Sequence, residues 1–363
     1  MLEENNWTCT LVHTAKLRRV SGDFRVGAGY PARVMALIGA TVASDYDAEI
    51  KKLDALSSTA QQPDIISDLS LTSSHLPLWK RIISETQFVA ATLPIYSVPA
   101  RNARIDSTEL LDRSIEQMEG GVGLLTIHPT TTRETLTLSN SRIVPYTSRG
   151  GGIVIRDLLT RNTADDNVYL QILPELVNCA RKTGTVLSLG ASFRSANIFD
   201  SNDAAQQAEL AMQKRLADEI SSAGVDVIIE SPGHAAPKSI AIIGKQLMAL
   251  GYPVMPLGPI PTDMAIGQDH IAACIGAVLL GIAGAAHILA AVTREEHTGG
   301  VPTLESILEA VAAARVAAHV LDLHRLDDSG ADMDIVTQRQ KYHTCIAGKV
   351  TRGCSRCGVA CPL

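Results

Sequence analysis

The sequence has few aromatic residues and no excess of positive charge. Phe, Trp and Tyr together make up 4% of the 363 residues, and 38 acidic against 32 basic side chains give a formal net charge of −6 at pH 7. The one basic cluster is the short run from Lys16 to Arg19. Because proteins that bind nucleic acid usually present a basic face, this charge argues against a nucleic-acid partner.

The chain also lacks the features of an exported or membrane-spanning protein. Its first residues, 1–7, are polar and acidic, unlike a secretory signal. Residues 271–292 are long enough for a membrane span, but they are rich in Ala and Gly, and Gly281 and Gly284 divide them into a helix-like and a strand-like part. We therefore expect a buried helix and a buried strand there, no membrane partner, and a cytoplasmic protein.

Short apolar runs alternate along the chain with amphipathic or Ala-rich helical patterns. Hydrophobic residues make up 46% of the sequence, which allows a sizeable core. The apolar runs lie at 33–38, 65–69, 88–95, 123–127, 143–146, 186–189, 225–229, 254–257 and 288–292, and the helical patterns at 48–56, 107–118, 168–183, 204–223, 237–250, 271–280 and 304–323. Strands that alternate with crossover helices are expected to pair in parallel.

The repeated unit favours a closed barrel. A doubly wound open sheet is the alternative, but it would normally begin with a Gly-rich phosphate turn, and the sequence has no GxGxxG. We predict an α/β fold, a (β/α)8 TIM-type barrel over residues 33–330, with an irregular N-terminal segment at 1–32 and a cysteine-rich tail at 331–363. Nine candidate strands are one too many for this barrel, so one of them is expected to be accessory.

Polar or charged residues follow most of the predicted strands. In a barrel the ends of these strands converge on the C-terminal rim, where such enzymes do their chemistry. Each residue alone is also typical of a loop or a helix cap, but the regularity of the pattern favours a site. The residues are Asp68, Tyr96, His128, Ser148, Arg149, Arg194, Glu230, His234, Asp263, Glu295, Glu296 and His297.

The glycine-rich segment 148–152 is a candidate anion-binding site, and two histidines are candidate metal ligands. In Ser148-Arg149-Gly150-Gly151-Gly152 the glycine backbone N–H groups can approach an oxyanion and Arg149 adds a charged fork, which favours an anion site over the alternative of a flexible glycine turn. Arg194 is a second candidate for a phosphate or carboxylate. His234 and His297 each follow a predicted strand and are candidate ligands for zinc or iron, the alternative being loop histidines bonded to backbone. His270, next to Asp269 at a predicted helix start, is interpreted as structural.

The cysteines gather at the C-terminus. Four of the seven lie in the last nineteen residues, and three of these form the pattern C-x2-C-x3-C: Cys345, then Cys354, Cys357 and Cys361. Such spacing lets a tight loop hold one metal centre, with Gly358 easing the turn. A structural zinc would need a fourth ligand, which Cys345 or His343 could supply. A [4Fe–4S] cluster held by three cysteines would leave one iron open for a small molecule.

Taken in order, these motifs resemble phosphomethylpyrimidine synthase, the non-classical radical S-adenosylmethionine enzyme of thiamine biosynthesis. The likeness runs from about residue 64 to residue 361. It rests on Leu93-Pro94-Ile95-Tyr96, Thr126-Ile127-His128, Ser148-Arg149-Gly150-Gly151, Ser188-Leu189-Gly190 with Arg194, Asn202-Asp203 with Gln206, Glu230-Ser231-Pro232-Gly233-His234, Leu257-Gly258-Pro259-Ile260, Thr262-Asp263, Asp269-His270-Ile271, Glu296-His297 and the terminal cysteines.

The resemblance implies a role for each matching residue. Cys354, Cys357 and Cys361 are expected to bind the [4Fe–4S] cluster, and His234 and His297 an additional zinc or iron. The implied substrate contacts, among which His128 and Glu230 are the candidate catalytic residues, are Tyr96, His128, Ser148, Arg149, Gly150, Arg194 and Glu230.

The resemblance also implies a reaction. S-adenosylmethionine is cleaved reductively to a 5′-deoxyadenosyl radical, which abstracts hydrogen from the ribose of aminoimidazole ribotide, and a rearrangement then gives hydroxymethylpyrimidine phosphate. The reductant is expected to be a protein such as ferredoxin or flavodoxin. A homodimer is expected, in which the cluster-bearing tail of one protomer reaches the barrel of its partner.

Several positions depart from the family pattern. Ala191 stands where the family has a carboxylate, Met255 where it has a tyrosine and Ser67 where it has a methionine, while Ser231 replaces a glycine and the last cysteine gap is three residues, not four. The metal and radical residues are kept, but the substrate pocket is atypical.

There are three alternatives, of which the first follows from these departures. One is 5-hydroxybenzimidazole synthase, a related enzyme that uses the same ribotide. A second is a metal-dependent hydrolase or lyase with a structural zinc in its tail. The third is a homologue that binds without catalysis, against which the retained cysteines and histidines argue.

Overall fold

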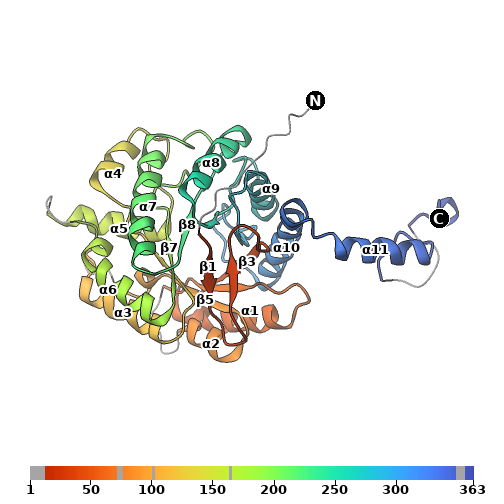
Figure 1. Cartoon of the computed structure of the whole chain (residues 1–363), viewed down its shortest axis with the longest axis horizontal. Coiled ribbons are helices and arrows are strands. Elements are labelled where there is room, and N and C mark those ends of the chain that lie inside the picture. Colours follow the sequence, from red (N-terminus) through yellow and green to blue (C-terminus); the bar gives the residue numbers. More distant parts are fainter. Residues whose placement is uncertain (1–12, 72–76, 100–102, 163–165, 349–355) are drawn as a thin grey trace. The chain divides into compact units, whose positions relative to one another are not determined.

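A computed structural model describes residues 13–71, 77–99, 103–162, 166–348 and 356–363. The chain forms two compact units, residues 1–321 and 322–363 (Figure 1). The first unit holds an eight-stranded parallel sheet in the order β10-β3-β4-β5-β6-β7-β8-β9. The strands are β3 (Arg33–Ile38), β4 (Ile65–Asp68), β5 (Val89–Thr92), β6 (Leu124–Ile127), β7 (Val186–Leu189), β8 (Val227–Glu230), β9 (Val254–Met255) and β10 (Ile288–Ala290).

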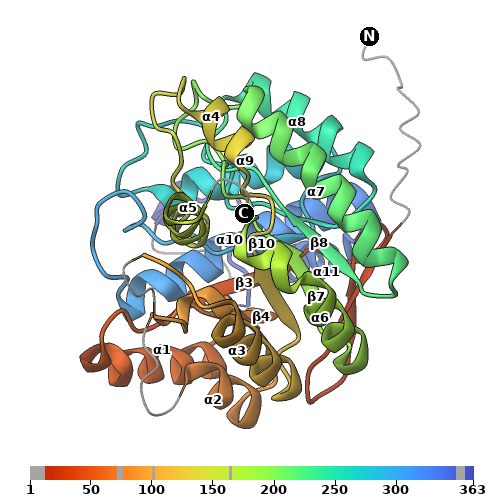
Figure 2. The ribbon, with the colours of Figure 1, turned by 90° about the vertical axis from the view of Figure 1, so that its left-hand side faces the viewer.

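The sheet curls into the predicted (β/α)8 barrel. Its two end strands meet where the backbone N–H of His287 donates to the carbonyl of Val254 at 2.9 Å. Because side chains alternate along a strand, Val34 and Ala36 of β3 pack outward against the helices, while Met35 points into the barrel. The helices lie around the outside of the strands (Figure 2).

The helices of the barrel unit match the seven predicted patterns, and three further ones appear. They are α1 (Tyr46–Ser58), α2 (Leu78–Glu85), α3 (Ser107–Glu119), α4 (Arg133–Ser139), α5 (Arg149–Thr160), α6 (Val168–Thr183), α7 (Ala204–Ser222), α8 (Pro237–Leu250), α9 (Asp269–Ile282) and α10 (Leu304–Leu326), which runs on into the second unit. Caps fix several starts: the side chain of Asp106 accepts from Thr108 N at 2.8 Å at the start of α3.

The ninth predicted strand, 143–146, is not a strand. The backbone N–H groups of Ile143 and Val144 donate to the carboxylate of Asp200, at 3.1 and 3.0 Å, instead of to a neighbouring strand. Ile143 is 71% exposed, so this apolar residue does not contribute to the core. The accessory run is therefore a loop held by a carboxylate.

The N-terminal segment is more regular than predicted. β1 (Ala15–Leu17) and β2 (Phe24–Val26) form an antiparallel hairpin whose alternate side chains are buried. Leu17 and Val26 are fully buried in one cluster with the first inward-pointing residues of the barrel strands, Ile65, Val89, Leu124, Val186, Ile228 and Ile288. The hairpin thus closes the N-terminal end of the barrel, opposite the rim that carries the polar residues. We expected an irregular segment because three-residue strands give almost no periodic signal.

The apolar stretch 271–292 forms the predicted helix and buried strand, but the helix is buried on one face only, since Ile271, Ile275 and Ile282 are exposed. α9 ends at Ile282, Gly284 turns the chain with φ +91°, and β10 begins at Ile288. In the described part of the chain, no helix combines the length and the apolar content needed to cross a bilayer.

The second unit carries the cysteine-rich tail. It contains α11 (Gly330–Lys341), whose residues are exposed, and the short 3-10 helix η3 (Gly358–Ala360). Gly358 has φ +52°, so it supplies the predicted easy turn between Cys357 and Cys361.

Candidate active site at the barrel rim

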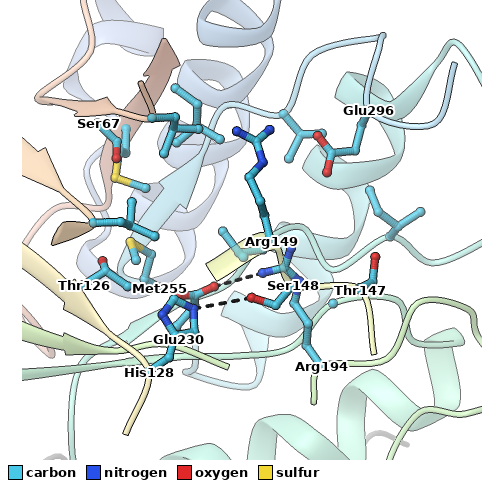
Figure 3. A pocket seen from close by; sticks show the side chains of 18 of the residues that line it. Ser67, Thr126, His128, Thr147, Ser148, Arg149, Arg194, Glu230, Met255 and Glu296 are labelled. Carbon is cyan, nitrogen blue, oxygen red and sulfur yellow. Dashed lines mark hydrogen bonds and ion pairs between the residues drawn. The ribbon is translucent and has the colours of Figure 1, made fainter. Parts of the chain in front are cut away.

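A cavity of about 350 Å³ opens at the C-terminal ends of the strands. The structure brings most of the predicted substrate and metal residues to its wall (Figure 3). These are Tyr96, His128, Ser148, Arg149, Arg194, Glu230, His234 and His297. Residues at the ends of five strands, β5, β6, β7, β8 and β10, and in the connections after them therefore converge on one site, as the pattern after each strand predicts.

His128 lies at the centre of the polar wall, directly after β6. Its imidazole Nε2 is 3.4 Å from Ser148 Oγ, and its backbone carbonyl accepts from the side-chain amide of Asn167 at 2.8 Å. Burial lowers the pKa of His128 to about 3, helped by the positive charge of Arg194. The imidazole is therefore neutral at physiological pH and can donate at one nitrogen and accept at the other.

Two glycines make room for this ring. A Cβ on Gly150 would lie 2.4 Å from His128 Cε1, and one on Gly190 would lie 2.6 Å from His128 Nε2. Neither glycine has a positive φ, so the requirement is for space. Gly150 thus acts through its contact with His128.

The glycine-rich segment 148–152, predicted to suit an anion, forms the N-cap and first turn of α5. Ser148 is the N-cap, and its Oγ accepts from Gly151 N at 3.1 Å. The alternative of a flexible turn is wrong because the helix starts at Arg149, and the favoured prediction of an anion site stays a prediction. A helix N-terminus carries unpaired N–H groups and a partial positive charge, which favour a phosphate.

Arg149 and Tyr96 pack against each other beside this helix start. The guanidinium carbon of Arg149 lies 5.6 Å from the centre of the Tyr96 ring, within reach of a cation–π contact. Burial raises the pKa of Tyr96 to about 12, although the nearby Arg149 and Arg194 oppose the shift. Tyr96 is therefore an uncharged phenol at neutral pH.

Arg194 and Glu230 form an ion pair in the cavity wall. The Arg194 Nη1 to Glu230 Oε1 distance is 3.1 Å. Burial raises the pKa of Glu230 to about 7, even though Arg194 acts to lower it. A carboxyl group with such a pKa can hold or release a proton at neutral pH.

The loop that carries Arg194 is held by a residue that sequence reasoning missed. Glu209 of α7 accepts from the backbone N–H groups of Ser192 and Phe193, at 2.7 and 2.8 Å, and from the hydroxyl of Thr130 at 2.8 Å. Its carboxyl group is buried, and burial raises its pKa to about 7. The only sequence signal was an acidic residue on the helix face that carries Leu210 and Leu216.

His234 and His297 face each other across the rim. Their Nε2 atoms are 3.0 Å apart, and each Nδ1 is bonded to a carboxylate, His234 to Asp263 and His297 to Asp269, both at 2.6 Å. Burial lowers the pKa of His234, while Asp263 opposes the shift. Asp269 is the first residue of α9, after the N-cap Gln268, and its carboxylate orients His297.

This pair fits a metal ion. Two imidazole nitrogens bound to one zinc at about 2.0–2.1 Å lie about 3.3 Å apart in a tetrahedral site, close to the separation found. The carboxylates on Nδ1 hold both Nε2 lone pairs toward the same point, as in other metal sites. Within the described ranges no third His, Cys, Asp or Glu completes a metal-binding group, so the remaining positions suit substrate or water.

Of the four substituted positions, two line the cavity, whereas Ala191 and Ser231 do not. Ser67 of β4 and Met255 of β9 belong to its wall, whereas Ala191 is buried in the loop after β7 and does not line it. The atypical positions therefore do change the pocket surface.

A second cavity, of about 460 Å³, lies on the other side of the histidine pair. It shares His234, Ile260 and His297 with the first cavity, and its further lining includes Phe199 and Ile266, which are 77% and 65% exposed. The histidine pair therefore stands between two cavities.

The cysteines of the C-terminal pattern are only partly described. Cys357 and Cys361 lie at the two ends of η3, where Ala360 N donates to the Cys357 carbonyl at 3.0 Å. Cys354 lies outside the described residues. A single 3-10 turn brings two thiol-bearing residues close together, and the soft thiolate donor set fits both an iron–sulfur cluster and zinc.

Comparison with known proteins distinguishes these possibilities. The model of the Radical SAM ThiC family matches residues 7–350. The phosphomethylpyrimidine synthase of Pyrobaculum aerophilum is 29% identical over 93% of this chain and 84% of its own length, and that of Methanopyrus kandleri is 33% identical over 83% and 71%. A solved dihydropteroate synthase from Yersinia pestis covers 84% of this chain and 98% of its own, with 10% identity and a TM-score of 0.45, too low to support an argument.

Membership of this family excludes the hydrolase alternative and implies two cofactors. A radical S-adenosylmethionine enzyme uses S-adenosylmethionine and an iron–sulfur cluster, which favours the cluster over zinc for the tail. The chain belongs to the Radical SAM ThiC family and is an enzyme of the phosphomethylpyrimidine synthase kind, acting in thiamine pyrimidine synthesis.

Proposed function

We propose that the polar wall of the rim cavity binds aminoimidazole ribotide, which the enzyme rearranges to hydroxymethylpyrimidine phosphate. The observation that carries this is the N-terminus of α5, which places Ser148 and Arg149 beside neutral His128 and the Arg194–Glu230 pair. One wall thus offers an anion site next to groups that can exchange protons.

The phosphate of the ribotide would lie at the start of α5. The helix N-terminus supplies backbone N–H groups and Arg149 supplies a full positive charge. Arg194 lies on the same wall and can pair with a second oxygen, although it already contacts Glu230. Tyr96 fixes Arg149 through its ring face.

The ribose would lie against His128 and Glu230. Neutral His128 can accept from a hydroxyl at one nitrogen and donate at the other. Glu230, with a pKa of about 7, can take up or give a proton during the rearrangement. We assign to these two residues the catalytic positions at the reacting sugar.

The histidine pair would hold one zinc or iron ion. Asp263 and Asp269 orient the two imidazoles so that both Nε2 lone pairs are directed at the same point. A metal ion bound there would polarise a ligand in its remaining coordination positions. The metal site borders the cavity, so the ion would be in reach of the substrate.

Cys354, Cys357 and Cys361 would bind the [4Fe–4S] cluster. The bound cluster supplies the reductive cleavage of S-adenosylmethionine that starts the reaction. The second cavity next to the histidine pair is our candidate for part of the S-adenosylmethionine site, because two reactants must meet there. We further propose a homodimer, and ferredoxin or flavodoxin as the electron donor.

Calorimetry on oxygen-free protein tests the polar wall. We expect aminoimidazole ribotide to bind to the wild type, and Arg149→Gln to weaken binding at least tenfold through loss of the phosphate contact. Arg156→Gln, on an exposed position of the same helix, is the matched control and should bind as the wild type does. Equal affinity in all three proteins would place the phosphate elsewhere.

A benzimidazole product is the second candidate. Ser67 and Met255 line the cavity at two positions that depart from the family pattern, and a changed wall can guide the same radical to a different product. The ribotide site and the metal site would be the same in both cases, so only the product distinguishes them.

A further inference from the structure

The helix that connects β7 to β8 has a buried face that is polar near the rim and apolar farther away. α7 begins at the rim, where β7 ends, and returns the chain toward the start of β8. In the half near the rim, its buried residues include Gln206, Glu209 and Gln213, which are 2%, 2% and 0% exposed. In the other half, the buried residues are Leu216, Ala217 and Ile220.

Polar side chains are uncommon on the buried face of a helix that packs against a barrel. Burying an amide or a carboxyl group costs free energy unless the group is hydrogen-bonded, whereas an apolar side chain at the same position is stabilising. All three polar residues of α7 are bonded to backbone groups at the rim. We therefore ask what each of these bonds holds in place.

Gln213 joins the ends of two neighbouring strands. Its side-chain Nε2 donates to the carbonyl of Leu189, the last residue of β7, at 2.9 Å, and to the carbonyl of Glu230, the last residue of β8, at 3.0 Å. Both bonds are buried, and a hydrogen bond in the protein interior is stronger than one in water. The amide therefore fixes the backbone of Glu230 relative to the end of β7.

The same two strand ends carry the ion pair of the cavity wall. Arg194 lies in the loop after β7, and its Nη1 is 3.1 Å from Oε1 of Glu230 (Figure 3). Glu209, one turn before Gln213 on the same face of α7, holds this loop through the backbone N–H of Ser192. Gln213 stands outside the cavity lining, so it reaches the site only through the residues it holds.

We propose that Gln213 is a positioning residue for the reaction: by holding the carbonyls of Leu189 and Glu230, its amide sets the place from which the Glu230 carboxyl group meets Arg194 and the substrate. The inference rests on the proposed function, because it takes Glu230 to lie at the reacting sugar. It adds to that function a residue that touches no ligand and acts through Glu230.

Crystal structures of the wild type and of Gln213→Met test the positioning without any ligand. Methionine is close to glutamine in length and volume, but it has no N–H to donate. We expect the Glu230 carboxyl group to move in the variant and its separation from Arg194 to exceed the roughly 4 Å limit of an ion pair. An unchanged pair would contradict the inference. Gln213→Asn, whose amide is one methylene too short to reach both carbonyls, serves the same comparison if the methionine variant does not fold.

Gln206→Met is the matched control. It makes the same substitution on the same buried face, but Gln206 Oε1 accepts from the backbone N–H of Asn202, at 2.6 Å, and holds no strand end. This variant should lose a buried hydrogen bond and still keep the Arg194–Glu230 pair in place. A displacement of the pair as large as in Gln213→Met would contradict a specific role for Gln213.

Calorimetry with aminoimidazole ribotide on oxygen-free protein separates positioning from a general loss of structure. We expect Gln213→Met to weaken binding roughly two- to twelvefold, the range of one hydrogen bond. The same change in a Glu230→Ala background should have no further effect, because the group through which Gln213 acts is gone. An equal loss in both backgrounds would overturn the inference and leave the proposed function standing. If the wild type does not bind the ribotide, the proposed function is wrong, and the crystal structures decide the inference.

Discussion

At the scale of single residues, the position of His128 depends on two glycines that leave it space. An alanine Cβ at position 150 would lie 2.4 Å from His128 Cε1, so the imidazole must move. We expect Gly150→Ala to destabilise the fold by about 1–3 kcal/mol, as overpacking does. Ribotide affinity should fall about tenfold as the ring leaves its position. Urea denaturation and calorimetry measure the two effects.

Gly152→Ala is the matched control on the same helix. A Cβ at position 152 meets nothing within 4 Å, and alanine favours a helix over glycine by about 1 kcal/mol. This variant should be as stable as the wild type or more so, with unchanged affinity. Equal losses in the two variants would show that backbone flexibility matters at this helix start, and not the space beside His128.

Two buried acids predict how stability depends on pH. The pKa values of Glu209 and Glu230 are raised from 4.5 to about 7, because burial disfavours their charged forms. Between these values the folded state binds more protons than the unfolded state, so this contribution stabilises at low pH and is lost as pH rises toward 7. We expect the urea concentration at the denaturation midpoint to decrease as the pH is raised from 5 to 7.5.

The variant Glu230→Gln removes one of the two titrating groups. The urea concentration at its denaturation midpoint should change less between pH 5 and pH 7.5 than that of the wild type. An identical slope in both proteins would mean that Arg194 keeps Glu230 ionised throughout, contrary to the raised pKa.

The sequence identified residues whose side chains are typical of catalysis or metal binding, but it did not identify the residues that hold them in position. His234 and His297 stand in short motifs after strands, and the structure brings their Nε2 atoms to 3.0 Å. In the sequence, Asp269 and Glu209 look like any other carboxylate residue of a helix. Their roles depend on contacts to residues 28 and 17 positions away, which only the fold reveals.

At the scale of elements, the β1–β2 hairpin is expected to stabilise the whole barrel. Leu17 is fully buried at the N-terminal end of the barrel, and the backbone N–H of Lys16 donates to Asp226 at 2.7 Å. Leu17→Ala should cost about 2–5 kcal/mol of unfolding free energy. Val20, at the hairpin turn, is 78% exposed, and Val20→Ala should stay within about 0.5 kcal/mol. Urea denaturation of both variants measures the two losses of unfolding free energy. Equal losses in Leu17→Ala and Val20→Ala would mean that the hairpin does not stabilise the barrel.

Long elements were predictable and short ones were not. The patterns at 168–183 and 237–250 match α6 and α8 at both ends, because many apolar positions repeat with the helical period. The run 143–146 has the composition of a strand, yet Asp200 takes its backbone N–H groups. The glycines at 150–152 suggest a turn, but packing against His128 and capping by Ser148 fix a helix there.

At the scale of the whole molecule, iron content should depend on the tail and stability on the barrel. Of the tail cysteines that the structure describes, Cys345, Cys357 and Cys361, none belongs to a hydrophobic cluster. We expect Cys357→Ser or Cys361→Ser to reduce iron and sulfide to background in oxygen-free protein. The main thermal unfolding transition should stay in place. Metal analysis and calorimetry measure the two quantities.

Cys345→Ser is the control for the identity of the tail metal. A three-cysteine cluster does not need Cys345, so this variant should keep its iron and its visible absorption. A zinc site would use a fourth ligand, and loss of one zinc per chain in Cys345→Ser would contradict the cluster.

The identity of the reaction product tests the account most directly. Oxygen-free protein is incubated with aminoimidazole ribotide, S-adenosylmethionine and dithionite, and the products are identified by mass spectrometry. We predict 5′-deoxyadenosine together with hydroxymethylpyrimidine phosphate. A benzimidazole would contradict the assigned product, and the absence of 5′-deoxyadenosine from iron-loaded protein would contradict radical chemistry at this rim.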